Sequence, residues 1–253
     1  MCFDHDSHPP IVPDPTGIRD AADVALEAGD GNRFAAYVAR AARPNGAAIV
    51  ILPDVRGLHT YYRELTERFA EHGVDAIAID YFGRTAGISD RGPGFDYAPH
   101  VAATTYAGMS ADVRAAAAHL RSVAGVERLY TTGFCMGGRL CFLTATMADL
   151  GLAGAIGFYG WPTGASRNDT PAPADVAATF TCPILGIFGG ADEGIPASAV
   201  AEFETALERA GVEHRITTYA GAPHSFFDRK AADFADASER AWAQTLGFMG
   251  VAK

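Results

Sequence analysis

The chain has 253 residues and a formal net charge of -10 at neutral pH, with 49% hydrophobic and 20% charged residues. This composition is typical of a globular protein and excludes an intrinsically disordered chain, which has few apolar residues for its charge. Nucleic acids and anionic membranes both select basic surfaces, so we expect neither as a partner of this acidic chain. The length favours one α/β domain over two.

The cysteines and the N-terminal residues indicate the cellular compartment to expect. The four cysteines form no CxxC pair, and they are too few for a disulfide scaffold in a chain of this length. Residues 1–30 lack the basic and apolar regions of a signal peptide. The apolar run at 47–52 is far shorter than the ~20 residues of a membrane span. We therefore expect a cytoplasmic protein, and we interpret Cys2, His5 and His8 as part of a surface arm and not as a metal site.

Short apolar segments alternate with helical segments along the chain. Residues 1–32, rich in proline and aspartate, are expected to form an N-terminal arm, and residues 33–253 a single domain. The expected strands are 33–40, 47–52, 74–79, 128–132, 153–159, 183–188 and 214–219. The expected helices are 61–72, 111–123, 136–148, 197–210 and 231–248. The alternation predicts an α/β fold, with a mainly parallel sheet and helices on both faces.

The segment Gly133-Phe134-Cys135-Met136-Gly137-Gly138 follows an expected strand and opens an expected helix. This G-x-C-x-G pattern is typical of a nucleophile elbow, a strained turn whose neighbouring residues must be small. The turn would place Cys135 at a helix N-terminus, where the helix dipole favours a thiolate. The alternative is a buried structural cysteine beside a tight glycine turn.

Two later residues supply partners for Cys135. Asp192 follows the strand expected at 183–188, and His224 follows the strand expected at 214–219. The carboxyl ends of parallel strands meet at one edge of a sheet, where ligands bind. The chain order nucleophile, acid, histidine is that of an α/β-hydrolase. We therefore predict a triad in which Asp192 orients His224 and His224 deprotonates Cys135.

These motifs, with Gly189-Gly190-Ala191-Asp192 and His224-Ser225-Phe226, resemble those of the dienelactone hydrolases, α/β-hydrolase-fold enzymes that use a cysteine nucleophile. The resemblance extends from about residue 34 to residue 248. It implies that the triad is Cys135, Asp192 and His224. It also implies that the substrate is an enol-lactone carrying a carboxylate.

The resemblance assigns further positions near the nucleophile. Asp54 stands where the family has a glutamate that contacts the resting thiol, and it is one methylene shorter. The oxyanion hole would use the backbone N–H groups of Met136 and Val55. Arg84 matches an arginine that binds the substrate carboxylate. Arg56 would add a second anion contact or pair with Asp54.

Aromatic residues after the expected strand ends are candidate walls of a substrate pocket. These substrate-binding candidates are Tyr97, Tyr159, Trp161 and Phe226. Core packing explains each of them equally well. Their bulk suggests a substrate other than the simplest dienelactone.

The sequence thus predicts a cysteine-dependent hydrolase of a small ester or lactone, with an acyl-enzyme intermediate and no metal or organic cofactor. One alternative is a hydrolase of another small ester or thioester with the same triad. Another is a catalytically silent binding protein with this fold. A monomer or a small homo-oligomer is expected.

Overall fold

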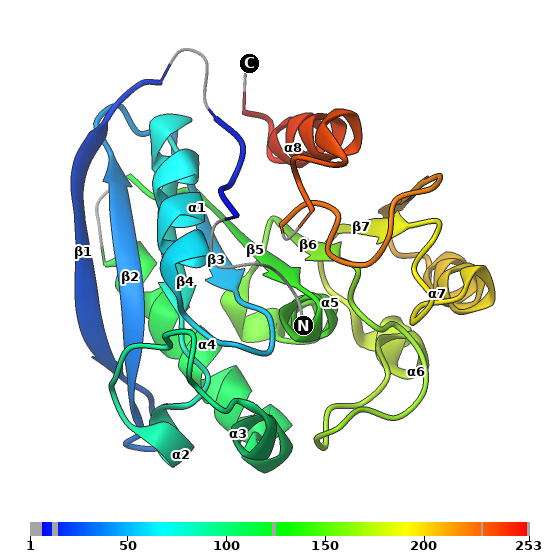
Figure 1. Cartoon of the computed structure of the whole chain (residues 1–253), viewed down its shortest axis with the longest axis horizontal. Helices are drawn as coiled ribbons and strands as arrows, with labels where there is room; N and C mark the ends of the chain where they lie inside the picture. The colour runs from blue at the N-terminus through cyan, green and yellow to red at the C-terminus, as the bar shows by residue number, and fades with distance from the viewer. Residues whose placement is uncertain (1–6, 12–14, 123–124, 229, 252–253) are drawn as a thin grey trace.

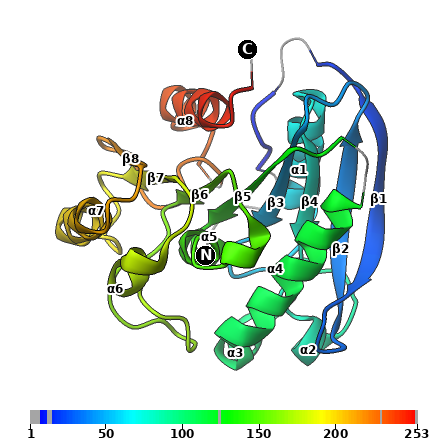
Figure 2. The same cartoon turned by 180° about the vertical axis from the view of Figure 1, so that it is seen from behind.

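The structure is a computed structural model and describes residues 7–11, 15–122, 125–228 and 230–251. Its centre is one eight-stranded sheet with the strand order β1-β2-β4-β3-β5-β6-β7-β8 (Figures 1 and 2). The strands are β1 (Ile18–Glu27), β2 (Arg33–Ala41), β3 (Ala47–Leu52), β4 (Asp75–Ile79), β5 (Arg128–Phe134), β6 (Gly154–Phe158), β7 (Ile184–Gly189) and β8 (His214–Tyr219). Strands β3 to β8 pair in parallel, whereas β1–β2 and β2–β4 are antiparallel. The predicted α/β fold with a mainly parallel sheet is confirmed.

The N-terminal arm expected over residues 1–32 is corrected for residues 18–27. These residues form β1, which pairs with β2 along its length, with Ala21 opposite Ala39 and Leu26 opposite Phe34. Most β1 side chains are exposed. An edge strand of this kind carries little apolar pattern, because backbone hydrogen bonds and not buried side chains hold it in place. Part of the expected arm, including Cys2 and His5, lies outside the described residues.

Helices cover both faces of the sheet. α1 lies in front of the sheet in Figure 1, and α4 lies in front in Figure 2, the view from behind. α8 packs beside α1, since the rings of Phe69 and Trp242 are 4.8 Å apart. The helices are α1 (Thr60–Glu71), α2 (Gly83–Ala86), α3 (Ala98–Ala103), α4 (Tyr106–Arg121), α5 (Met136–Thr144), α6 (Pro173–Val176), α7 (Ala197–Ala210) and α8 (Ala235–Phe248), with 3-10 turns at Ala148–Leu150 and Ala177–Thr179.

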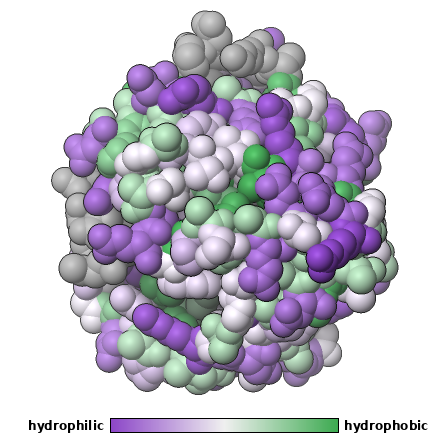
Figure 3. All heavy atoms as spheres, turned by 90° about the vertical axis from the view of Figure 1, so that its right-hand side faces the viewer, coloured by the Kyte–Doolittle hydropathy of each residue, from purple (hydrophilic) through white to green (hydrophobic). Residues whose placement is uncertain are grey.

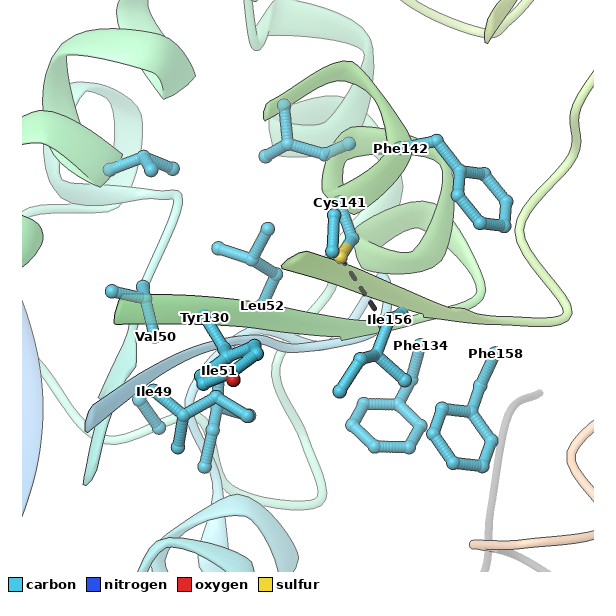
Figure 4. Close-up of a cluster of buried hydrophobic side chains, with 14 of the residues drawn as sticks. Ile49, Val50, Ile51, Leu52, Tyr130, Phe134, Cys141, Phe142, Ile156 and Phe158 are labelled. Carbon is cyan, nitrogen blue, oxygen red and sulfur yellow. Dashed lines mark hydrogen bonds between the residues drawn. The ribbon is translucent and has the colours of Figure 1, made fainter. Parts of the chain in front are cut away.

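The central strands are buried on both faces, which explains their continuous apolar runs. Every residue of β3 is buried, as is every residue of β7. Phe134 and Phe158 stack at 4.8 Å below the sheet in Figure 4, while Cys141 and Phe142 of α5 lie above it. This two-sided core holds the carboxyl ends of β3, β5, β6, β7 and β8 in fixed relation to one another.

The outer surface is of mixed polarity. On the face shown in Figure 3, polar residues alternate with weakly hydrophobic ones, and the strongly hydrophobic ones gather in one small area near its centre. Within the described residues, no helix has the length and apolar character needed to span a membrane.

Candidate active site

Cys135 lies on a sharp turn between β5 and α5. Its backbone has φ 55° and ψ -112°, in the positive-φ region that side chains other than glycine rarely adopt. Its N–H donates to the carbonyl oxygen of Phe158 at 3.1 Å. A Cβ atom added at Gly133 would lie 2.0 Å from the carbonyl oxygen of Gly137, and one added at Gly137 would lie 2.0 Å from that of Leu52. Both glycines are therefore required for the turn, and the thiol of Cys135 is partly exposed.

Asp192 and His224 form a direct pair. His224 Nδ1 lies 2.6 Å from Asp192 Oδ2. Because an ionised carboxylate only accepts, Nδ1 is the donor in this contact, and in the neutral imidazole Nε2 is then the acceptor. The other oxygen, Oδ1, accepts the backbone N–H groups of Gly194 at 2.9 Å and Ile195 at 3.2 Å. The carboxylate is buried, so these bonds fix its orientation.

Cys135 opens into a cavity of about 420 Å³. Of the residues predicted to form the site, the structure brings Val55, Tyr97, Met136 and Trp161 to this cavity with Cys135. The remaining lining residues come from the α3–α5 region and from the segment after β6. They are Val101, Met109, Arg139, Leu140, Ala165, Ser166, Arg167, Asn168 and Thr170.

The segment after β3 that carries Val55 is held from several sides. The Leu58 N–H donates to Asp80 Oδ1 at 3.2 Å, and the Tyr81 hydroxyl donates to the carbonyl oxygen of Pro53 at 2.9 Å. Asp54 is fully buried, and its Oδ1 accepts the backbone N–H of Arg56 at 2.8 Å. The contact of Asp54 with the thiol and the anion-binding role of Arg56 stay predictions.

Comparisons with known proteins show the family to which the chain belongs. Residues 34–252 match the sequence model of the Dienelactone hydrolase family. The chain belongs to the dienelactone hydrolase family. It is therefore a hydrolase that acts on ester or lactone bonds.

Individual relatives cover most of the chain. It is 31% identical over 226 residues to a "Putative carboxymethylenebutenolidase" of Escherichia coli (strain K12), covering 85% of this chain and 82% of that protein. It is 29% identical over 211 residues to a "Probable 2-oxo-3-(5-oxofuran-2-ylidene)propanoate lactonase" of Bradyrhizobium sp, covering 80% and 82%. A "Putative Dienelactone Hydrolase" structure from Klebsiella pneumoniae superposes with a TM-score of 0.78 at 28% identity, covering 90% of this chain and 99% of that chain. The predicted α/β-hydrolase fold is confirmed.

Arg84 does not lie where the family resemblance placed it. Its guanidinium pairs with Asp112 at 2.5 Å and with Asp30 at 2.6 Å. It lines a small separate hollow with residues such as Tyr81 and Gly108, and not the cavity of Cys135. The prediction that Arg84 binds the substrate carboxylate is therefore corrected, since two carboxylates of this chain already occupy the guanidinium.

Tyr159 and Phe226 are also corrected as cavity walls, because both are completely buried behind the histidine. The Tyr159 ring lies 5.0 Å from that of His224 and 5.9 Å from that of Phe226. Burial, together with acidic neighbours that include Asp228, raises the pKa of the Tyr159 hydroxyl well above its usual range. Tyr159 and Ser225, the residue after His224, both have positive φ, at 36° and 60°, so the backbone is strained at both positions.

Two residues that were not predicted from the sequence, Arg139 and Arg167, also line the cavity. Arg139 stands four residues after Cys135 on α5, the spacing that puts two side chains on one helix face. This spacing could have predicted that Arg139 lies near Cys135. Arg167 belongs to an irregular segment after β6, and nothing in the local sequence indicates where its side chain points.

The other described cysteines differ from Cys135. Burial raises the pKa of the Cys141 and Cys182 thiols to about 12, so both stay protonated at neutral pH. Cys141 donates to the carbonyl oxygen of Ile156 at 3.2 Å (Figure 4). Among the residues that the structure describes, no group of three or more His, Cys, Asp or Glu side chains is arranged to hold a metal ion.

Proposed function

We propose that the protein is a cysteine-dependent hydrolase of a small ester or lactone, and that Cys135, His224 and Asp192 are its catalytic residues. One observation carries this proposal. A strained cysteine lines a cavity, and a pair formed by the buried Asp192 and the partly exposed His224 follows neighbouring strands at the same edge of the sheet.

In this proposal each group has its own role. Asp192 keeps the Nδ1 proton of His224 in place, so Nε2 can accept the proton of the Cys135 thiol. The sulfur then attacks the carbonyl carbon. The backbone N–H groups of Met136 and Val55 are the proposed oxyanion hole, and one such donor is typically worth ~3 kcal/mol to the transition state.

The proposed reaction has two halves, acylation of Cys135 and hydrolysis of the acyl-enzyme. When the tetrahedral intermediate collapses, the C–O bond to the leaving group breaks and His224 returns its proton to that oxygen, which leaves an acyl-thioester on Cys135. A water molecule then attacks the thioester and gives its proton to His224. The C–S bond breaks, and the proton returns to the sulfur as the acid product leaves.

The relatives indicate what class of substrate to test first. The name of the Bradyrhizobium relative describes a propanoate attached to an oxofuran ring, which is a lactone that carries a carboxylate. We propose a substrate of this class for the present chain. A neutral ester or a thioester is the second candidate, because the cavity is lined mostly by apolar side chains.

The test is the loss of the ultraviolet absorbance of a dienelactone, and in parallel the release of p-nitrophenol from p-nitrophenyl acetate. We expect Cys135→Ala to reduce turnover at least a thousandfold without altering the circular dichroism spectrum. Cys182→Ala is the matched control, since Cys182 precedes β7 and so lies at the opposite edge of the sheet. Residual activity of Cys135→Ala above a few per cent contradicts the nucleophile assignment.

Site-resolved alkylation with iodoacetamide separates an enzyme from a silent binding protein. We expect Cys135 to react at neutral pH and Cys141 and Cys182 to stay unmodified, because their thiols are protonated there. An inert Cys135, with neither ester cleaved, supports the silent alternative.

A further inference from the structure

The part of the cavity lining that follows β6 is held by one arginine. Arg139 is buried, and its guanidinium has five N–H donors. Its five hydrogen bonds all go to residues 161–170. The acceptors are the Thr170 hydroxyl at 3.2 Å and the carbonyl oxygens of Trp161 at 3.1 Å, Thr163 at 3.4 Å, Gly164 at 2.9 Å and Thr170 at 3.0 Å. Arg139 therefore has no donor left for a ligand and acts as a brace for this segment.

The braced segment presents a second arginine to the cavity. Arg167 is exposed and lines the cavity with its neighbours Ser166 and Asn168. Within the described part of the chain, its guanidinium makes no ion pair and no side-chain hydrogen bond. The nearby Asp169 does not line the cavity, and its carboxylate accepts the backbone N–H of Tyr106 at 2.5 Å. Arg167 thus offers a positive charge on a braced segment, without a competing carboxylate.

The charge of the cavity contrasts with that of the chain. The described lining contains Arg139 and Arg167 and no aspartate or glutamate, although the chain carries a formal net charge of -10. A cavity whose charged groups are all of one sign attracts ligands of the opposite sign. The rest of the lining, from Met109 and Leu140 to Trp161, is mainly apolar.

We propose that Arg167 binds the carboxylate of the substrate, while the apolar part of the substrate lies between Trp161 and the side chains of Met109 and Leu140. The guanidinium can hold a carboxylate with two parallel charge-assisted hydrogen bonds. The proposal rests on the proposed function and deepens it, because it moves the anion site from Arg84 to the segment after β6. It names the residue that would recognise the carboxylate of such a substrate.

Binding to the inactive Cys135→Ala protein tests this proposal without turnover. The probes are 4-(butanoyloxy)benzoate and its neutral isostere 4-(butanoyloxy)benzamide, compared by calorimetry. We expect the benzoate to bind about tenfold more tightly, Arg167→Gln to abolish the difference and Arg167→Lys to retain part of it. Arg43→Gln is the matched control, because Arg43 is exposed and precedes β3 at the opposite edge of the sheet.

Equal affinities for the two probes, the absence of binding, or a preference that survives Arg167→Gln each overturn the Arg167 proposal. Kinetics with the active protein distinguish its failure from that of the proposed function. Cleavage of both esters at equal rates, unaffected by Arg167→Gln, leaves the hydrolase intact and removes the anion site. A benzoate preference in binding without cleavage by the active protein keeps the anion site and rejects the hydrolase.

Discussion

The two carboxylate oxygens of Asp192 have different hydrogen-bond partners. Oδ1 accepts two backbone N–H groups, which fixes the loop after β7, and Oδ2 accepts the Nδ1 proton of His224. An asparagine can satisfy the same backbone donors through its carbonyl oxygen, but its amide nitrogen would then donate toward Nδ1. The proton of the neutral imidazole would move to Nε2, which could no longer accept the thiol proton.

We therefore predict that Asp192→Asn keeps the fold and lowers kcat by up to about 10⁴-fold, the loss seen when a triad histidine is held in the wrong tautomer. The measurement is steady-state hydrolysis of p-nitrophenyl acetate, with the thermal midpoint followed in parallel. Glu193→Gln is the matched control, since it removes a neighbouring exposed charge from the same loop. A kcat within threefold of the wild type excludes an orienting role for Asp192.

At the scale of residues, the sequence predicts the candidate triad better than the substrate contacts. Cys135 directly follows β5, and Asp192 and His224 lie in the loops that follow β7 and β8, so the strand pattern alone indicates the sheet edge to which they belong. The prediction that Arg84 binds the substrate was wrong because residues 83–86 form α2 and the Arg84 guanidinium pairs with Asp30 and Asp112. Local patterns do not reveal pairings between residues so distant in the chain.

The elbow between β5 and α5 tolerates no side chain at its glycines. At Gly137, an added Cβ would meet the backbone carbonyl oxygens of Leu52 and Pro53 at 2.0 and 2.3 Å. These atoms belong to β3 and to the segment that carries Val55, so neither can move without displacing the proposed oxyanion hole. Two elements are thus packed backbone to backbone at this point.

We predict that Gly137→Ala lowers the free energy of unfolding by more than about 3 kcal/mol, as expected when a core is overpacked against rigid backbone. Gly247→Ala is the matched control. It lies in α8 with no atom within 4 Å of the added Cβ, and it should raise stability by about 0.5–1 kcal/mol. The free energies of unfolding of both variants are measured by urea unfolding. Equal stability of Gly137→Ala and Gly247→Ala would show that the elbow has room for a methyl group.

Whole elements are predictable from the sequence when a buried face leaves a pattern. The parallel strands β3 to β7 have such patterns, whereas β1 is mostly exposed and was expected to be part of an arm. α4 begins at Tyr106, five residues before the alanine-rich run, because the Thr105 side chain accepts the N–H of Gly108 and caps the helix. Backbone pairing and capping extend these elements beyond their apolar residues.

At the scale of the whole molecule, the core contains many acids that stay protonated. Burial raises the pKa of the Cys141 and Cys182 thiols to about 12, from 9.0. Burial likewise raises the pKa of four core tyrosine hydroxyls well above 10.0: Tyr61, Tyr62, Tyr81 and Tyr159. At the acidic end, burial lowers the pKa of His72 and His119 below 6.5.

These shifts set a pH window for stability. An acid whose pKa is raised on folding stabilises the protein fully below its unfolded value, and that contribution is lost as the pH rises toward the folded value. A histidine whose pKa is lowered on folding stabilises the protein above about pH 6.5, and this stabilisation is lost as the pH falls. We therefore predict that the free energy of unfolding is greatest between about pH 7 and 9 and falls on both sides.

Urea midpoints measured from pH 5 to pH 11 test this window. Each acid that is protonated in the folded state and ionised in the unfolded state lowers the free energy of unfolding by about 1.4 kcal/mol per pH unit. Cys182→Ala removes one such group, so its alkaline fall should be shallower than that of the wild type by up to this slope. A midpoint that rises between pH 9 and pH 11, or a Cys182→Ala profile with an unchanged alkaline slope, contradicts the assignment of the alkaline limb to buried thiols. The buried tyrosines also lower the stability at alkaline pH. The difference between the wild-type and Cys182→Ala profiles therefore isolates the contribution of the Cys182 thiol.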